Sequence, residues 1–210
     1  MNNCDVSLYL VTDRELSLGR SHQYIVEQAI KGGVTMVQLR EKNISTREFY
    51  NLAIELKQTL KPLNIPLIIN DRLDIALAVD AEGLHIGQSD IPYHIAREIL
   101  GKNKIIGLSV ETVEQARSAN NLDVDYIGLS PVFSTQTKHD INTPLELEGI
   151  QQIASFTKHK TVAIGGINTQ NTADIIKAGA DGIAVVSAIV SQKDPRQAAC
   201  DLKSIVDKNK

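Results

Sequence analysis

The chain has 210 residues, of which 42% are hydrophobic and 22% are charged, a balance typical of one globular domain. Its formal net charge of −3 provides no global positive field and argues against nucleic acid as a partner. No apolar run approaches the roughly 18 residues of a membrane span, and no basic segment precedes an apolar one as in a secretory signal. We therefore expect a cytoplasmic protein that binds neither membrane nor nucleic acid.

Short apolar runs rich in β-branched residues alternate along the chain with amphipathic stretches of helical period. Eight runs predict strands, and the helical stretches between them predict parallel pairing through βαβ crossovers. The predicted strands are Ser7–Thr12, Thr35–Arg40, Pro66–Asn70, Gly83–Ile86, Lys104–Ser109, Tyr126–Ser130, Thr161–Gly165 and Gly182–Val186.

Two of the intervening helices have clear end signals. Ser45 followed by Glu48 is a capping-box pattern, which predicts a helix over 46–60. Asn168 or Thr169 is a suitable cap for a helix over 170–178, and a glycine follows that stretch at position 179.

Eight β/α units without a linker, charge block or low-complexity segment predict an α/β fold, a single-domain (β/α)8 TIM barrel over residues 1–210. The alternative is an open doubly wound sheet. That architecture needs only about five or six strands, so the eight predicted strands favour the barrel.

The most informative polar segment is Val37–Lys42, at the end of the second predicted strand. Barrel enzymes carry their active sites at the C-terminal ends of the strands. Because side chains alternate along a strand, Gln38, Arg40 and Lys42 share one face and Leu39 lies on the other. An amide and two cations that point together form a donor array suited to phosphate oxygens. The alternative is a strand end that becomes a solvated, charged loop.

Two aspartates follow the third and fourth predicted strands. Asp71 comes directly after Asn70, and Asp90 follows the short strand over 83–86. Adjacent parallel strands lie about 4.8 Å apart, so the two carboxylates are able to reach one ion. Carboxylates without a His or Cys cluster favour a hard cation such as Mg²⁺. The alternative for each aspartate is a simple helix N-cap.

A long polar loop over 130–140 follows the sixth predicted strand and contains Ser134, Thr135, Thr137 and Lys138. Its hydroxyl and N–H groups suit a phosphate, to which the lysine adds charge. An ordinary polar surface loop has a similar composition, so this segment alone decides nothing.

The loops after the seventh and eighth predicted strands form a phosphate site in many barrels. Here they contain Gly165 and Gly166, which allow close backbone approach to an anion, and the hydroxyl of Ser187. One group of predicted site residues, which contains Asp71, Asp90 and the cations Arg40, Lys42 and Lys138, suits a diphosphate. The two loops described here suit a monophosphate. Binding of both ligands together predicts a transferase that releases pyrophosphate.

The motifs together resemble the thiamine phosphate synthase family over nearly the whole chain and in the same order. The motifs that carry the resemblance are YLVTD (Tyr9–Asp13), VQLREK (Val37–Lys42), IIND (Ile68–Asp71), GLHIGQSD (Gly83–Asp90), IGLS (Ile106–Ser109), SPVFSTQTK (Ser130–Lys138), AIGGI (Ala163–Ile167) and VVSAI (Val185–Ile189).

The resemblance implies an enzyme that joins 4-amino-2-methyl-5-(diphosphomethyl)pyrimidine to a thiazole phosphate, plain or carboxylated, giving thiamine monophosphate and pyrophosphate. It implies one Mg²⁺ per subunit and a dissociative reaction in which pyrophosphate leaves first. The implied pyrimidine-site residues are Gln38, Leu39, Arg40, Glu41, Lys42, Asn70, Ser109 and Lys138. The implied thiazole-site residues are Thr135, Gln136, Thr137, Gly166, Val186 and Ser187. The implied metal ligands are Asp71 and Asp90, and the implied catalytic cations are Arg40, Lys42 and Lys138.

The chain departs from the usual family pattern at Ser130, Ser134, Val110 and Glu111. These departures leave every implied charged and metal position intact. Three rival functions share the barrel: a thiazole tautomerase, a sugar-phosphate epimerase or isomerase, and a non-catalytic ligand sensor. A tautomerase would not need the complete diphosphate site. An epimerase or isomerase would need a base near a C–H bond. A sensor would need an output domain, and nothing in the sequence resembles one. The sequence leaves a homo-oligomer open.

The five histidines do not form a catalytic or metal-binding pattern. His22, His94 and His159 are predicted to be solvated, and His85 to be a hydrogen-bonded core residue rather than a ligand. His139 lies next to Lys138, and nothing in the sequence requires it to act.

Overall fold

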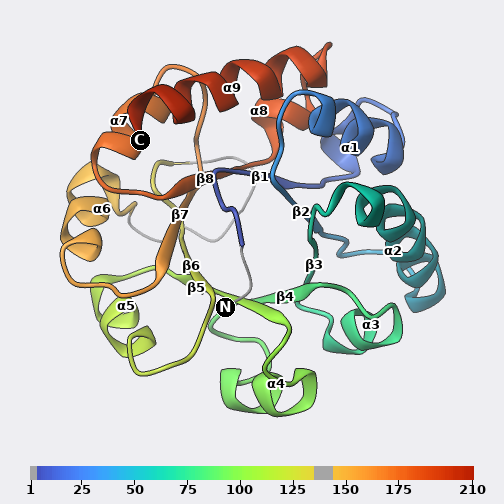
Figure 1. Cartoon of the computed structure of the whole chain (residues 1–210), viewed down its shortest axis with the longest axis horizontal. Helices are drawn as coiled ribbons and strands as arrows, with labels where there is room; N and C mark the ends of the chain where they lie inside the picture. Colours follow the sequence, from blue (N-terminus) through green and yellow to red (C-terminus); the bar gives the residue numbers. More distant parts are fainter. Residues whose placement is uncertain (1–3, 135–143) are drawn as a thin grey trace.

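The fold is a closed barrel of eight parallel strands surrounded by helices, as a computed structural model shows for residues 4–134 and 144–210 (Figure 1). The strands follow one another around the ring in chain order, and β1 pairs with β8 to close it. The strands are β1 Leu8–Val11, β2 Met36–Leu39, β3 Leu67–Asn70, β4 Gly83–Ile86, β5 Ile105–Val110, β6 Tyr126–Leu129, β7 Lys160–Ile164 and β8 Gly182–Val185.

The helices lie outside the strands and separate each strand from the next. The helices are α1 His22–Lys31, α2 Thr46–Leu60, α3 Leu73–Ala78, α4 Tyr93–Leu100, α5 Val113–Ala119, α6 Glu146–Ala154, α7 Thr172–Lys177, α8 Ser187–Val190 and α9 Pro195–Asn209, with short 3₁₀ turns η1 Glu15–Ser17 and η2 Lys61–Leu63. None of the helices in the described ranges is long and apolar enough to cross a membrane. The predicted barrel and all eight predicted strands are confirmed, with ends that differ by no more than a residue or so.

The predicted helix ends are partly confirmed. The Ser45 hydroxyl accepts a hydrogen bond from the Glu48 N–H at 3.2 Å and begins α2. The Glu48 carboxylate pairs with Arg14 at 3.1 Å, so the second half of a capping box is replaced by an ion pair. The helix predicted over 170–178 is shorter, because Asn168 holds a turn by accepting from the N–H of residue 170.

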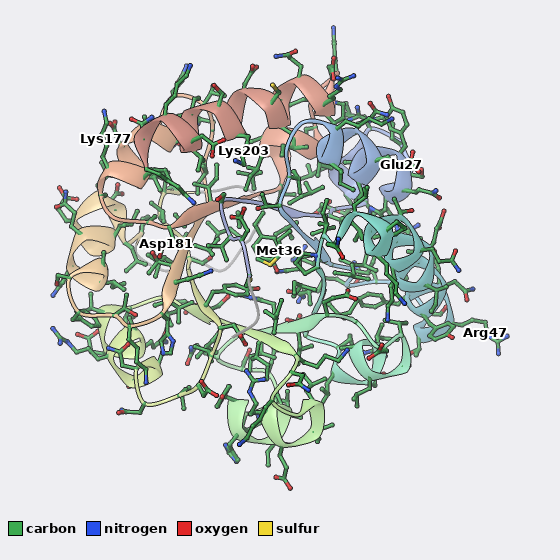
Figure 2. All side chains as sticks on the ribbon, viewed as in Figure 1. Glu27, Met36, Arg47, Lys177, Asp181 and Lys203 are labelled. Atoms are coloured by element: carbon green, nitrogen blue, oxygen red, sulfur yellow. The ribbon has the colours of Figure 1, made fainter. Side chains whose placement is uncertain are left out.

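Two apolar layers build the core. The larger layer lies between the strands and the helices, and the smaller one fills the barrel interior. Figure 2 shows Met36 near the middle of the ring, whereas Glu27, Arg47 and Lys177 lie on the outer helices. Buried Cys4 and Val6, ahead of β1, join the interior layer and close the N-terminal end of the barrel. The predicted site residues that the structure describes lie at the opposite end, at or after the C-terminal ends of the strands.

Candidate active site

Two cationic side chains that follow β2 pair with aspartates that follow the two neighbouring strands. The Arg40 guanidinium pairs with Asp13, after β1, at 3.5 Å, and the Lys42 ammonium pairs with Asp71, after β3, at 2.8 Å. Gln38 is buried in the barrel interior, whereas Leu39 is buried in the outer layer, as strand alternation predicts. The two cations therefore lie on either side of the β2 end at the mouth of the barrel.

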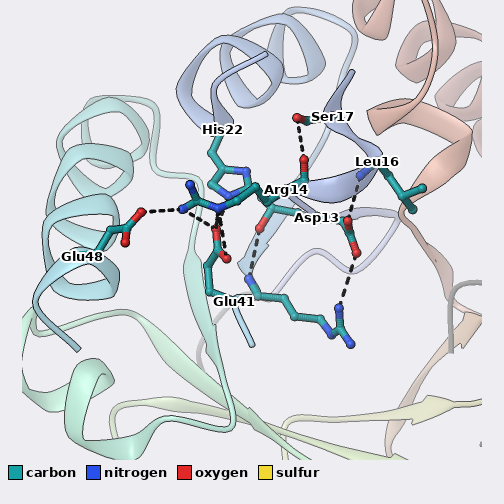
Figure 3. A network of polar contacts seen from close by, with 9 residues as sticks. Asp13, Arg14, Leu16, Ser17, His22, Glu41 and Glu48 are labelled. Atoms are coloured by element: carbon teal, nitrogen blue, oxygen red, sulfur yellow. Dashed lines mark hydrogen bonds and ion pairs between the residues drawn. The ribbon is translucent and has the colours of Figure 1, made fainter. Parts of the chain in front are cut away.

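The side chain of Glu41 is held in a network on the α1 and α2 side of the loop (Figure 3). Its carboxylate contacts His22 Nε2 at 2.5 Å and Arg14 Nη2 at 3.1 Å, and it is only 5% exposed. The prediction that His22 is solvated was wrong, because the ring is buried against this carboxylate. Anchoring Glu41 fixes the backbone that carries Arg40 and Lys42. We expect any contact between Glu41 and a ligand to come from its backbone.

Asp71 and Asp90 come together at the ends of β3 and β4. The Asp71 N–H donates to the His85 carbonyl at 2.9 Å and its backbone has φ of +60°, while the Asp90 carboxylate accepts from the Gly87 N–H at 2.7 Å. The two carboxyl groups lie within hydrogen-bonding distance of each other. Neither aspartate caps a helix, since α3 begins after Arg72 and α4 after Pro92, without a side-chain cap at either residue.

The two carboxyl groups have opposite pKa shifts. Burial alone would raise the pKa of Asp71, but the hydrogen bond and charge of Lys42 lower it below its ordinary value. Burial raises the pKa of Asp90, and the neighbouring Asp71 carboxylate raises it further. A bound cation would favour the ionised form of both. Two half-buried carboxylates fit Mg²⁺, which takes one or two protein carboxylates and completes its shell with water and phosphate oxygens.

Asn70 and Ser109 line the same mouth from β3 and β5. Asn70 is 8% exposed, and its amide has no hydrogen-bond partner among the residues that the structure describes. The Ser109 hydroxyl lies 2.8 Å from His85 Nε2. The ring of His85 also contacts the Tyr126 hydroxyl at 3.0 Å, so the histidine is hydrogen-bonded as predicted, but it is half-buried rather than fully in the core.

The β7 and β8 side of the mouth is formed by backbone rather than by charged side chains. Gly165 and Gly166 have φ of +103° and +66°, and a Cβ on Gly166 would lie 2.8 Å from the Cβ of Phe133. Ser187 begins α8 directly after Val186. In α8 the N–H groups of Ile189 and Val190 donate to the Val186 carbonyl, so those of Ser187 and Ala188 are the ones available to an anion.

Four residues predicted for the site, Thr135, Gln136, Thr137 and Lys138, lie outside the described residues, as does His139. The segments on either side of them are fixed beside β7. The Phe133 N–H donates to the Gly165 carbonyl at 3.2 Å, and the Leu145 N–H donates to the Pro131 carbonyl at 2.9 Å. The described residues on both sides of this stretch therefore lie near Pro131, which is next to Gly165 at the end of β7.

Residues 8–189 match the family model described as thiamine monophosphate synthase. The chain belongs to this family. A thiamine-phosphate synthase of Syntrophomonas wolfei is 53% identical over 209 residues, and the match covers 100% of both chains. One from Clostridium novyi is 50% identical over 198 residues, covering 94% of this chain and 97% of that protein. The resemblance inferred from the motifs is confirmed.

A solved structure of thiamine phosphate pyrophosphorylase from Pyrococcus furiosus has a TM-score of 0.89 at 39% identity, covering 98% of this chain and 97% of that one. The barrel itself is shared more widely. The 3-hexulose-6-phosphate synthase of Salmonella typhimurium has a TM-score of 0.74 at 15% identity, covering 97% of this chain and 100% of that one. This second likeness shows only the fold, so the family assignment depends on the closer relatives.

Sequence reasoning missed three residues that contact the predicted site residues of this synthase-family barrel directly or through one neighbour. Asp13 pairs with Arg40, while Tyr9 and Tyr126 meet in the barrel interior and contact Gln38 and His85. Asp13 directly follows the first predicted strand, so its position in YLVTD was a usable signal. The two tyrosines gave no signal, because a tyrosine in a predicted strand is usually part of the apolar core.

Proposed function

We propose that the chain is a thiamine-phosphate synthase, a transferase that joins an aminopyrimidine methyl diphosphate to a thiazole phosphate and releases pyrophosphate. The observation that carries this proposal is 53% identity to a named synthase over the full length of both chains. The geometry supports it, because one end of the barrel combines a charged region at β2–β4 with a backbone region at β7–β8. A diphosphate fits the first region and a monophosphate the second.

In this proposal the pyrimidine diphosphate lies against the β2–β5 side. Gln38, Asn70 and Ser109 face the ring, and Arg40 and Lys42 contact the diphosphate together with Lys138 of the undescribed segment. Arg40, Lys42 and Lys138 are the catalytic cations in this proposal. When pyrophosphate leaves, negative charge grows on its oxygens, and fixed cations stabilise that charge. The thiazole nitrogen then bonds to the pyrimidine methyl carbon, so the reaction needs no strong general base.

We propose that Asp71 and Asp90 hold one Mg²⁺ against the diphosphate. The support is their mutual contact and their unlike pKa shifts, which leave a partly buried carboxyl pair that a cation stabilises. When bound, Mg²⁺ neutralises charge on the leaving pyrophosphate. Lys42 already contacts Asp71 at 2.8 Å, so the same lysine is within reach of a ligand at this carboxylate.

The thiazole phosphate lies in this proposal at Gly166, Val186 and Ser187, with Thr135, Gln136 and Thr137 completing its site. The support is the left-handed backbone of Gly166, which lets the chain approach an anion without a Cβ, and the hydroxyl at the start of α8. A thiazole tautomerase would use this region alone. The ion-paired carboxylates and cations at the β2–β4 side favour the synthase over that rival.

The test is pyrophosphate release by purified protein with both substrates and Mg²⁺. We expect release that needs the thiazole phosphate, is abolished by EDTA and falls about 100-fold or more in Asp71→Ala. The matched control is Asp74→Ala, three residues along the same segment, where the carboxylate pairs with Arg72. That variant should keep full activity. If folded wild-type protein releases no pyrophosphate, the proposal is wrong, and thiazole tautomerisation is the next reaction to measure.

A further inference from the structure

A continuous chain of hydrogen bonds crosses the barrel interior beneath the mouth. The Gln38 amide Nε2 donates to the Tyr9 hydroxyl at 2.8 Å, and the two tyrosine hydroxyls lie 2.9 Å apart. The Tyr126 hydroxyl contacts His85 Nδ1 at 3.0 Å, and His85 Nε2 contacts the Ser109 hydroxyl at 2.8 Å. The chain therefore links β2 to β5 through β1, β6 and β4, and both of its ends are residues assigned to the pyrimidine site.

The packing of the barrel interior accommodates these hydrogen-bonded side chains. The Tyr9 and Tyr126 rings are fully buried and meet edge to face with centroids 5.8 Å apart, and His85 stacks on Tyr126 at 5.6 Å. A Cβ on Gly107 would overlap the Tyr126 ring, so a glycine is required beside it. Burying a hydroxyl is unfavourable unless it is hydrogen-bonded, and phenylalanine would fill the same space without that penalty.

Counting protons gives the chain a direction. Burial raises the pKa of Tyr9 and of Tyr126, so each phenol is neutral and has one proton to donate. Tyr9 already accepts from Gln38, and its own proton goes to Tyr126. The Tyr126 proton then goes to His85 Nδ1, which leaves a proton on Nε2 to donate to Ser109. With the Gln38 nitrogen as the donor to Tyr9, every donor in this series of hydrogen bonds has an acceptor.

This direction determines what the two ends offer to a ligand. The Gln38 amide uses its nitrogen inside the barrel, and no residue in the described ranges donates to its oxygen Oε1. The Ser109 hydroxyl accepts from His85 and keeps its own proton to donate. One acceptor and one donor match an aminopyrimidine, which has an amino group to donate and a ring nitrogen to accept. An oxo group beside a protonated ring nitrogen presents the opposite pattern.

We propose that Tyr9, Tyr126 and His85 are positioning residues that orient the Gln38 amide and the Ser109 hydroxyl, and thereby select an amino-substituted pyrimidine over an oxo-substituted one. The inference rests on the proposed function. None of the three residues needs to touch the substrate. They act by opposing rotation of the Gln38 amide to present its nitrogen, since rotation would place the amide oxygen against Tyr9 and would require every hydrogen bond from Tyr9 to Ser109 to reverse.

The experiment compares Tyr126→Phe with wild type on the aminopyrimidine diphosphate and on its 4-oxo analogue, at saturating thiazole phosphate. Tyr126→Phe keeps the ring packing and removes the central hydroxyl. We expect kcat/KM for the amino substrate to fall about tenfold while kcat/KM for the oxo analogue holds or rises, so that the selectivity ratio falls at least tenfold. The KM for thiazole phosphate should not change.

The matched control is Tyr93→Phe on α4, which removes a phenol that contacts Arg97 at 3.3 Å outside the barrel and should leave both rates unchanged. Tyr9→Phe tests the same chain at a second point if Tyr126→Phe does not fold. The double variant should be little worse than one single variant, because either change breaks the chain. An equal loss on both substrates would mean a merely structural role and would overturn the inference. Inactive wild-type protein would instead refute the proposed function.

Discussion

The two ends of the barrel use the same charged residue types for different purposes. At the N-terminal end, three carboxylates that precede β4, β6 and β8 each accept the backbone N–H of a residue at the start of the preceding strand. These contacts are Glu82 with Leu67 at 3.1 Å, Asp125 with Ile106 at 2.9 Å and Asp181 with Thr161 at 2.8 Å. The carboxylates there hold neighbouring strands together in pairs.

At the C-terminal end the carboxylates instead face cations around the mouth. Asp13 pairs with Arg40, and Asp71 pairs with Lys42, whose side chain is 53% exposed. At the opposite end Arg97 is only 14% exposed and also donates to three carbonyls. A charged group with one partner and open access can exchange that partner for a ligand. A group with several partners inside the fold, as Arg97 has, cannot do so without unfolding its surroundings.

The largest effect should come from the arginine at the mouth. Arg40→Gln removes a cation assigned to the leaving pyrophosphate, and we expect kcat to fall about 100-fold. Stability should change by less than about 1 kcal/mol, because the Arg40–Asp13 contact is long and partly exposed. Steady-state pyrophosphate release and denaturant unfolding measure the two quantities.

The same substitution at the other end gives the contrast. Arg97→Gln removes contacts to Asp125 and to the carbonyls of Gly101, Lys104 and Asp123. We expect it to lower the free energy of unfolding by about 2 kcal/mol and to leave kcat within about twofold. A large loss of kcat in Arg97→Gln, or a large loss of stability in Arg40→Gln, would contradict the division between the two ends.

The barrel could be predicted from the sequence because each strand is a short apolar run with its own helix after it. The same strand assignments predict that the side chains after the strands lie at one end, since parallel strands bring their C-terminal ends together. These side chains include Arg40, Lys42, Asp71 and Asp90. The position of Glu41 did not follow. Alternation places it opposite Arg40, but only the packed helices bring His22 and Arg14 to its carboxylate.

The hydrogen bonds in the barrel interior could not be predicted from the sequence, for a similar reason. Tyr9 and Tyr126 are 117 residues apart, and nothing local indicates that their hydroxyls meet. Strand alternation gives only the side of the sheet, and the depth at which two side chains meet depends on the tilt of the strands around the closed ring. The backbone anion site that we propose at Gly166 was predictable only because many barrels bind phosphate at this place in the fold.

A smaller effect should distinguish the backbone region of the mouth from an ordinary loop. Gly166→Ala places a Cβ 2.8 Å from Phe133 in a left-handed backbone, and we expect the KM for thiazole phosphate to rise about tenfold. Gly101→Ala is the control, since its φ is +75° and its Cβ would meet nothing within 4 Å. Both variants should lose about 1–3 kcal/mol of stability from backbone strain. A raised KM in Gly101→Ala would show that strain alone weakens binding.

The smallest effect concerns a carboxylate at the N-terminal end that, unlike its neighbours, is exposed. Asp80 pairs with Lys104 and Lys57, and the hydrogen bond from Lys104 is the main cause that lowers the pKa of its carboxyl. A lowered pKa in the folded state stabilises the fold above the unfolded value of about 3.9, and this contribution is lost as the pH falls through the folded value. Since Asp80 is 77% exposed, solvent screening limits the contribution to less than about 1 kcal/mol.

Asp80→Asn isolates this charge, because asparagine also tolerates the left-handed backbone found at this position, with φ of +51°. We expect the free energy of unfolding of the variant to be slightly below that of wild type at pH 7, and the two to converge below about pH 4. High salt should shrink the difference at pH 7 as well. A difference that persists in acid would mean that Asp80 acts through its uncharged hydrogen bonds. Unchanged kcat at pH 7 would assign this charge, like that of Arg97, to the stability of the barrel rather than to its chemistry.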